Sequence, residues 1–254
     1  RAFSFGGGVQ SMAVLVLQAQ GRINYDVFLF SNVGEDSENP DTLEYYRDHA
    51  VPYAETNGIR LVEVRRETRN SETLYQRLLR SDRSIDIPIR MKNGAPGNRT
   101  CTHDFKIAVI QKWMGKGNHV VGLGFSWDEL HRINSDVYKH KRFFSEYPLI
   151  DLRMTRIDCS KLISDARLPV PLKSSCWFCP FHKPSVWQEM RQKKPNTFRK
   201  SVELENCIND KRAALGRDNV YLTRFGVPLE QAIGDQPFLF ELDDDTCETG
   251  YCMT

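Results

Sequence analysis

The stretch Phe5-Gly-Gly-Gly-Val-Gln-Ser11 joins a short apolar run, Ala2 to Phe5, to a second apolar run that begins at Val9. Consecutive glycines let backbone N–H groups converge on a phosphate, and the N-terminus of a following helix adds partial positive charge. The stretch lacks the Gly-Lys-Ser/Thr ending of a Walker loop and the Gly-x-Gly-x-x-Gly spacing of a dinucleotide-binding turn. Taken alone, it indicates either a phosphate-binding loop or a tight turn between a strand and a helix.

Strand-like and helix-like segments alternate after this turn and predict an α/β fold. The expected strands cover residues 2–5, 25–33, 59–64 and 119–123, and the expected helices cover 9–20, 40–56 and 102–114. Such alternation implies a parallel twisted sheet with helices on both faces. We expect a nucleotide-binding domain over 1–150, a cysteine-cluster and helical region packed on it over 151–234, with a helical layer at 183–217, and an acidic, cysteine-bearing tail over 235–254.

One long segment, 81–99, shows no periodicity and contains Pro88, Gly94, Pro96 and Gly97. Loops of this length in compact domains are usually lids or binding segments. We therefore expect this segment to form part of a binding site.

Composition limits the classes of protein that the chain can belong to. No apolar run approaches the roughly 20 residues that a membrane-spanning helix needs, so no membrane partner is expected. The net charge of +2 neither requires nor excludes nucleic acid. Seven cysteines, an odd number, without a secretory leader indicate metal-binding or redox-active thiols in a reducing cytoplasm.

Three cysteines form the second informative pattern: Cys101, and the pair in Lys173-Ser-Ser-Cys-Trp-Phe-Cys-Pro180. A Cys-x-x-Cys turn directs two sulfurs at one ion. Structural zinc needs four ligands, which Cys101, Cys176 and Cys179 could complete with either His182 or Cys159. An iron–sulfur cluster is also held by cysteine thiolates, normally four. Thiols without any metal are the third alternative.

Further motifs accompany the loop and the cysteines: Asn32-Val-Gly-Glu-Asp-Ser-Glu-Asn-Pro40, Arg99-Thr-Cys-Thr-His-Asp-Phe-Lys106, and Gly122-Leu-Gly-Phe-Ser-Trp-Asp-Glu129 with Arg132. In combination these motifs resemble the PP-loop ATP pyrophosphatases, and among them the phosphoadenosine-phosphosulfate reductase-like branch. The Cys-x-x-Cys-Pro run is similar to the cluster-binding segment of that branch's iron–sulfur members. Phe125 stands where the family usually has arginine.

The resemblance implies roles for individual residues. The residues expected to bind phosphate are Gly6, Gly7, Gly8, Gln10 and Ser11. The backbone of Phe30 and Ser31 is expected to bind adenine, and Gly34 and Gly124 are expected in the same nucleotide site. Lys106 and Arg132 are the catalytic cations, together with Ser11, and Asp128 and Glu129 either hold Mg²⁺ or pair with Arg132. A [4Fe–4S] cluster, or zinc in its place, is expected on Cys101, Cys176, Cys179 and Cys159. If Cys159 is not a ligand, one iron stays open.

The resemblance also orders the possible reactions. The first is ATP-dependent sulfur insertion, similar to that of the DNA phosphorothioation ATP pyrophosphatase, with ATP, Mg²⁺ and the cluster as cofactors. Its expected partners are nucleic acid and a cysteine desulfurase or other sulfur donor. The second is reduction of a sulfonucleotide, with Cys247 or Cys252 as nucleophile, although the tail lacks the Glu-Cys-Gly-x-His order of such reductases. The third is a non-catalytic nucleotide-binding module stiffened by zinc.

Overall fold

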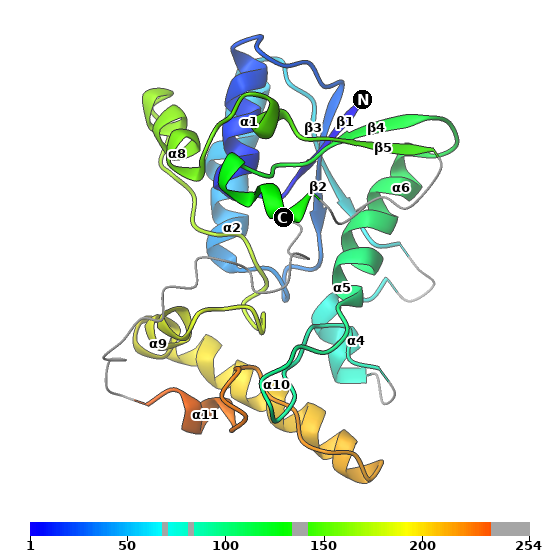
Figure 1. Ribbon diagram of the computed structural model, residues 1–254, viewed down its shortest axis with the longest axis vertical. Helices are drawn as coiled ribbons and strands as arrows, with labels where there is room; N and C mark the ends of the chain where they lie inside the picture. The colour runs from blue at the N-terminus through cyan, green and yellow to red at the C-terminus, as the bar shows by residue number, and fades with distance from the viewer. Residues whose placement is uncertain (68–70, 81–83, 134–141, 235–254) are drawn as a thin grey trace.

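A computed structural model describes residues 1–67, 71–80, 84–133 and 142–234 of the chain (Figure 1). Its centre is a five-stranded, all-parallel sheet in the order β3-β2-β1-β4-β5. The strands are β1 (Ala2–Phe5), β2 (Val27–Asn32), β3 (Leu61–Arg65), β4 (His119–Gly122) and β5 (Phe143–Glu146). The predicted α/β fold with a parallel sheet and flanking helices is confirmed.

Helix α1 (Val9–Ala19) lies between the sheet and α8 (Arg156–Asp165). Every residue of α1 from Val9 to Leu17 is buried, which explains why this helix has almost no polar face. Helix α8 begins at a capping box in which Thr155 N–H donates to Asp158 Oδ2 at 2.8 Å. Helix α8 lies beyond residue 150, the expected end of the nucleotide-binding domain. Because it packs on α1, it belongs to the helical layer that covers the sheet.

Two other helical segments contain a π turn each. Residues 40–56 form α2 (Pro40–Tyr45), a π turn η1 (Tyr46–Ala50) and α3 (Val51–Thr56), so the predicted helix over this range is confirmed. On the opposite face of the sheet lie α5 (Thr100–Thr102), the π turn η2 (His103–Ile107) and α6 (Ala108–Met114). This helical segment begins at Thr100 rather than at 102, which places Cys101 in its first turn.

A helical part lies beside the sheet (Figure 1). It consists of α4 (Leu74–Arg80), α9 (Pro184–Lys193), α10 (Pro195–Ala214) and α11 (Leu229–Ala232). Its core contains Trp177, Phe178 and Trp187, each at most 6% exposed. The predicted helical layer at 183–217 is confirmed, whereas α4 and the edge strand β5 were not expected. The short elements α7 (Pro148–Asp151) and η3 (Trp127–Arg132) complete the described chain, in which no helix is long and apolar enough to cross a membrane.

A buried carboxylate fixes the connection that follows α10. Glu205 is 1% exposed, and its two oxygens accept the N–H groups of Leu222 and Leu229 at 2.6 Å each. Burial raises the pKa of Glu205, while the two N–H donors oppose that shift. Glu205 thus holds two points of the chain between α10 and α11, and the Asn209 side chain holds a third through the N–H and the carbonyl of Val220.

We predict that Glu205→Gln lowers the free energy of unfolding by about 1–3 kcal/mol, since the amide group would set an N–H against a backbone N–H donor in a buried site. Denaturant unfolding followed by far-UV circular dichroism measures the loss. Glu203→Gln, at an exposed position on the same helix, is the matched control and should change stability little. Equal effects of the two substitutions would contradict the buried role of Glu205.

Candidate nucleotide and cysteine site

The predicted nucleotide-binding residues meet at one edge of the sheet. Strand β1 has β2 on one side and β4 on the other, so the chain changes direction across the sheet at β1. In parallel α/β sheets, ligands bind at the carboxyl ends of the strands beside such a switch point. The glycine turn follows β1, Ser31 and Gly34 lie at the end of β2, and Gly124 follows β4.

The glycine turn is shaped by close contacts. Gly7 has φ +75°, and a Cβ atom there would stand 2.8 Å from Thr42 Cγ2. Gly8 is the N-cap of α1, and it has no side chain to accept the N–H groups of the first helical turn. Those N–H groups have no acceptor within the helix. The turn therefore leaves a helix N-terminus suited to an anion.

Ser11 and Gln10 brace this turn. Ser11 Oγ donates to the carbonyl of Gly8 at 2.9 Å. Gln10 Nε2 donates to Glu129 Oε2 at 3.2 Å, and the same carboxylate oxygen accepts the Ser126 N–H at 3.3 Å. Gly124 lies against this first turn, because its Cβ would stand 3.5 Å from Ser11 N. The loops after β1 and β4 are thereby joined.

Residues at the end of β2 differ in what they can offer a ligand. The Phe30 ring stacks on Tyr46 with centroids 4.3 Å apart, so its side chain belongs to the core. The side chain of Ser31 is buried, and its Oγ has no hydrogen-bond partner among the described residues. Gly34, at φ +132°, closes a turn in which its carbonyl accepts the N–H groups of Ser37 and Glu38 at 2.9 Å.

The segment that precedes the Cys-x-x-Cys pair packs against the loop after β2. Asn39 N–H donates to the carbonyl of Ser175 at 3.1 Å, and Trp177 N–H donates to the carbonyl of Ser37 at 3.3 Å. The indole of Trp177 adds a 2.7 Å hydrogen bond to the carbonyl of Asp36. Two segments about 140 residues apart in the chain thus form one wall.

Ser174 extends this wall to the glycine turn. A Cβ on Gly8 would stand 3.1 Å from Ser174 Oγ and 3.5 Å from Ser174 N. Ser174 Oγ is buried without a hydrogen-bond partner among the described residues. Ser174 was not predicted as a site residue, because its position depends on the long-range pairing of its segment.

The structure brings together three of the predicted cysteines. Burial raises the pKa of Cys101, and Arg99 opposes the shift. Burial also raises the pKa of Cys176 well above its usual value, Glu38 raises it further, and Lys106 lowers it. Cys179 N–H donates to the carbonyl of Cys176 at 3.1 Å, and Cys101 and Cys176 pack against the same apolar cluster, so the three residues lie in one region.

Lys106 and Glu38 lie beside this thiol group. Lys106 Nζ is 4.0 Å from Glu38 Oε1, and the Glu38 side chain is 2% exposed. Burial raises the pKa of Glu38, while Lys106 lowers it. Glu38 also pairs through its backbone with Cys176. Glu38 was not predicted as a site residue, because a glutamate in a polar loop gives no sequence signal of burial.

Cys159 and His182, the two candidates for a fourth ligand, differ in their position relative to this group. Cys159 is in α8 and belongs to the core around α1, and burial with the nearby Asp128 raises its pKa to about 12. The structure does not bring Cys159 to the other three cysteines. His182 lies close to them, but its Nε2 donates to the carbonyl of Cys176 at 3.0 Å, and burial lowers its pKa to about 4.

Two residues of the motif that follows β4, Phe125 and Asp128, make structural contacts. Phe125 is 1% exposed and stacks on Tyr147, so its side chain belongs to the core. Asp128 Oδ1 accepts the N–H of Arg156 at 3.0 Å. Arg132 is the last residue of η3; its side chain, like Cys247 and Cys252, lies outside what the structure describes.

The donor set can be compared with the expected metal groups. Within the described ranges, no group of three or more His, Cys, Asp or Glu side chains is arranged to hold a metal ion. Thiolate sulfur is a ligand both of zinc and of [4Fe–4S] clusters, so the chemistry of Cys101, Cys176 and Cys179 suits either group.

This chain matches no protein-family model. It also matches no curated protein and no solved structure.

We predict that Gly7→Ala costs more stability than Gly21→Ala. Both positions have positive φ, but a Cβ at Gly21 meets nothing within 4 Å, whereas one at Gly7 overlaps Thr42. The overlap should add about 1–3 kcal/mol to the strain that both substitutions share. Denaturant unfolding of the two variants compares them directly, and equal losses would show that the turn is not tightly packed.

Proposed function

We propose that the chain is an ATP pyrophosphatase that adenylates an acceptor oxygen so that sulfur can replace it. The observation that carries this proposal is the shared wall in which Ser174, two residues before Cys176, lies against Gly8 of the glycine turn. A phosphate-binding helix N-terminus and a group of thiols are then within reach of one substrate. The resemblance of the motifs to the PP-loop ATP pyrophosphatases supports the same reaction.

The reaction has two steps. In the first, an oxygen of the acceptor attacks the α-phosphorus of ATP, forming an O–P bond, and the bond to pyrophosphate breaks with its electron pair leaving on pyrophosphate. In the second, a sulfur nucleophile bonds to the acceptor atom that carries this oxygen, and AMP departs with the oxygen. Activation is required because oxide and hydroxide are poor leaving groups, whereas AMP is a good one.

Residues of the chain take parts in these steps. The N–H groups at the start of α1 bind phosphate oxygens, and Ser11 holds the turn in shape. Lys106 offsets the negative charge that develops during transfer, with Mg²⁺ accompanying the nucleotide. Cys101, Cys176 and Cys179 would hold the [4Fe–4S] cluster, which when bound supplies iron that can carry sulfide.

The expected partners follow from this chemistry. Nucleic acid is the proposed acceptor, and a cysteine desulfurase or another donor supplies the sulfur. A reducing cytoplasm suits thiols that serve as cluster ligands. Sulfonucleotide reduction, the alternative reaction, would use Cys247 or Cys252 as the nucleophile, and both lie outside the described residues.

Ser11→Ala should reduce pyrophosphate release from ATP by about tenfold, because the turn loses one hydrogen bond that fixes its shape. Iron content should stay unchanged, since Ser11 lies on the phosphate side of the wall. An enzyme-coupled pyrophosphate assay and iron analysis of the same preparation measure both properties. Unchanged release would remove Ser11 from the nucleotide site.

Cys176→Ser should have the reverse effect, with loss of iron and of visible colour while ATP still binds. Cys159→Ser is the matched control, because this thiol lies in the core around α1, away from the other three. We expect Cys159→Ser to retain its iron after anaerobic purification. Iron loss in Cys159→Ser but not in Cys176→Ser would reverse the ligand assignment.

A further inference from the structure

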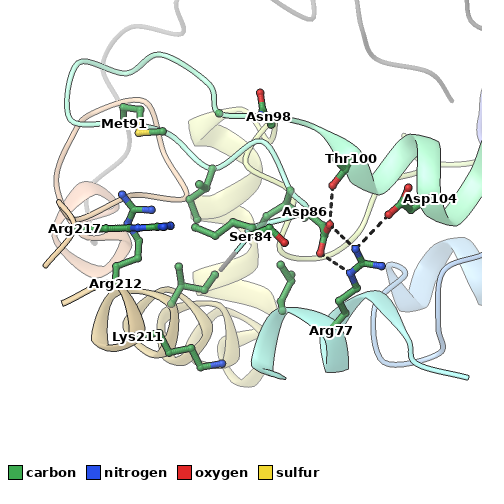
Figure 2. A pocket seen from close by; sticks show the side chains of 16 residues that line it. Arg77, Ser84, Asp86, Met91, Asn98, Thr100, Asp104, Lys211, Arg212 and Arg217 are labelled. Atoms are coloured by element: carbon green, nitrogen blue, oxygen red, sulfur yellow. Dashed lines mark hydrogen bonds and ion pairs between the residues drawn. The ribbon is translucent and has the colours of Figure 1, made fainter. Parts of the chain in front are cut away.

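A pocket of about 370 Å³ opens between α4, the segment 84–100 and α10 (Figure 2). This volume falls within the range of small-molecule sites in proteins, about 300–1,000 Å³. Its walls combine apolar and charged side chains, and the apolar part includes the buried Leu78, Ile87, Ile89 and Ile208. Part of the wall comes from the long segment that the sequence analysis expected to form a binding site.

One end of the pocket is occupied by a compact ionic network. Arg77 Nε lies 2.8 Å from Asp86 Oδ2, and its Nη2 lies 3.3 Å from Asp104 Oδ2. Thr100 Oγ1 donates to Asp86 Oδ1 at 2.7 Å. The arginine at this end is therefore already matched by two carboxylates.

The opposite end carries positive charge. Lys211, Arg212 and Arg217 line it, and Figure 2 shows both arginines at the end away from Arg77. Arg212 Nε donates to the carbonyl of Asp218 at 2.6 Å, and Lys211 donates to the carbonyl of Leu79. The two acidic residues of the lining, Asp86 and Asp104, both belong to the other end.

The pocket also adjoins the cysteine site. Thr100, which lines the pocket, precedes Cys101, and the N–H of Cys101 donates to the carbonyl of Asp86 at 2.8 Å. A ligand in the pocket would thus contact the backbone that positions one of the three thiols.

From this arrangement we infer that the pocket binds a small organic anion with an apolar body and one carboxylate, sulfonate or phosphate group. The apolar body lies against the isoleucine and leucine side chains. The anionic group lies against the guanidinium groups of Arg212 and Arg217, whose planar donor sets match oxygen anions. This site is separate from the glycine turn, and it does not depend on the proposed ATP reaction.

The test uses 1-anilinonaphthalene-8-sulfonate, an aromatic probe with one sulfonate, and N-phenyl-1-naphthylamine, its uncharged analogue. Fluorescence titration of the wild-type protein should show saturable one-site binding of the sulfonate, at least about tenfold tighter than the analogue. The double variant Arg212→Gln with Arg217→Gln should abolish that preference. Added salt should weaken the sulfonate more than the analogue.

The matched control is Arg199→Gln with Lys200→Gln, which removes the same charge from exposed positions of α10 outside the pocket. It should leave both titrations unchanged, and circular dichroism should show native helix content in both double variants. Absence of one-site binding, equal affinity for the two probes, or equal losses in the two double variants would each overturn the inference. None of these results depends on whether the protein turns over ATP.

Discussion

The backbone pairing between Ser37–Asn39 and Ser175–Trp177 is the constraint on which the site depends. It joins the loop after β2 to the Cys-x-x-Cys segment, and the indole of Trp177 strengthens it through Asp36. Because of this pairing, Ser174 reaches Gly8, and Glu38 lies beside Cys176. Without it, the glycine turn and the thiols would belong to unconnected parts of the chain.

Burial determines the electrostatics of the region that contains Glu38, Cys101 and Cys176. Thiols and the Glu38 carboxylate are less stable as anions in this environment, which raises the pKa of Glu38, Cys101 and Cys176. Lys106 lowers the pKa of all three groups. One lysine therefore interacts with the Glu38 carboxylate and with two of the three thiols.

Local sequence predicted the sheet and the glycine turn well, since both depend on short-range patterns. The apolar runs at residues 2–5 and 9–17 and the glycines between them indicate a strand, a turn and a buried helix. Strand β5 was not predicted, because a strand of four residues at a sheet edge is too short to show a clear alternation of apolar and polar side chains. The cysteine group was only partly predictable. Spacing selects Cys176 and Cys179, but only the tertiary structure shows that Cys101, and not Cys159, lies with them.

The positions of Ser174 and Glu38 could not be derived from spacing, because they depend on pairing between distant segments.

The most direct test of the proposed function is anaerobic purification with a visible spectrum and metal analysis, followed by incubation with ATP and Mg²⁺ and assay for pyrophosphate. The account predicts a brown, iron-containing protein that releases pyrophosphate. A colourless zinc protein that leaves ATP intact would contradict it.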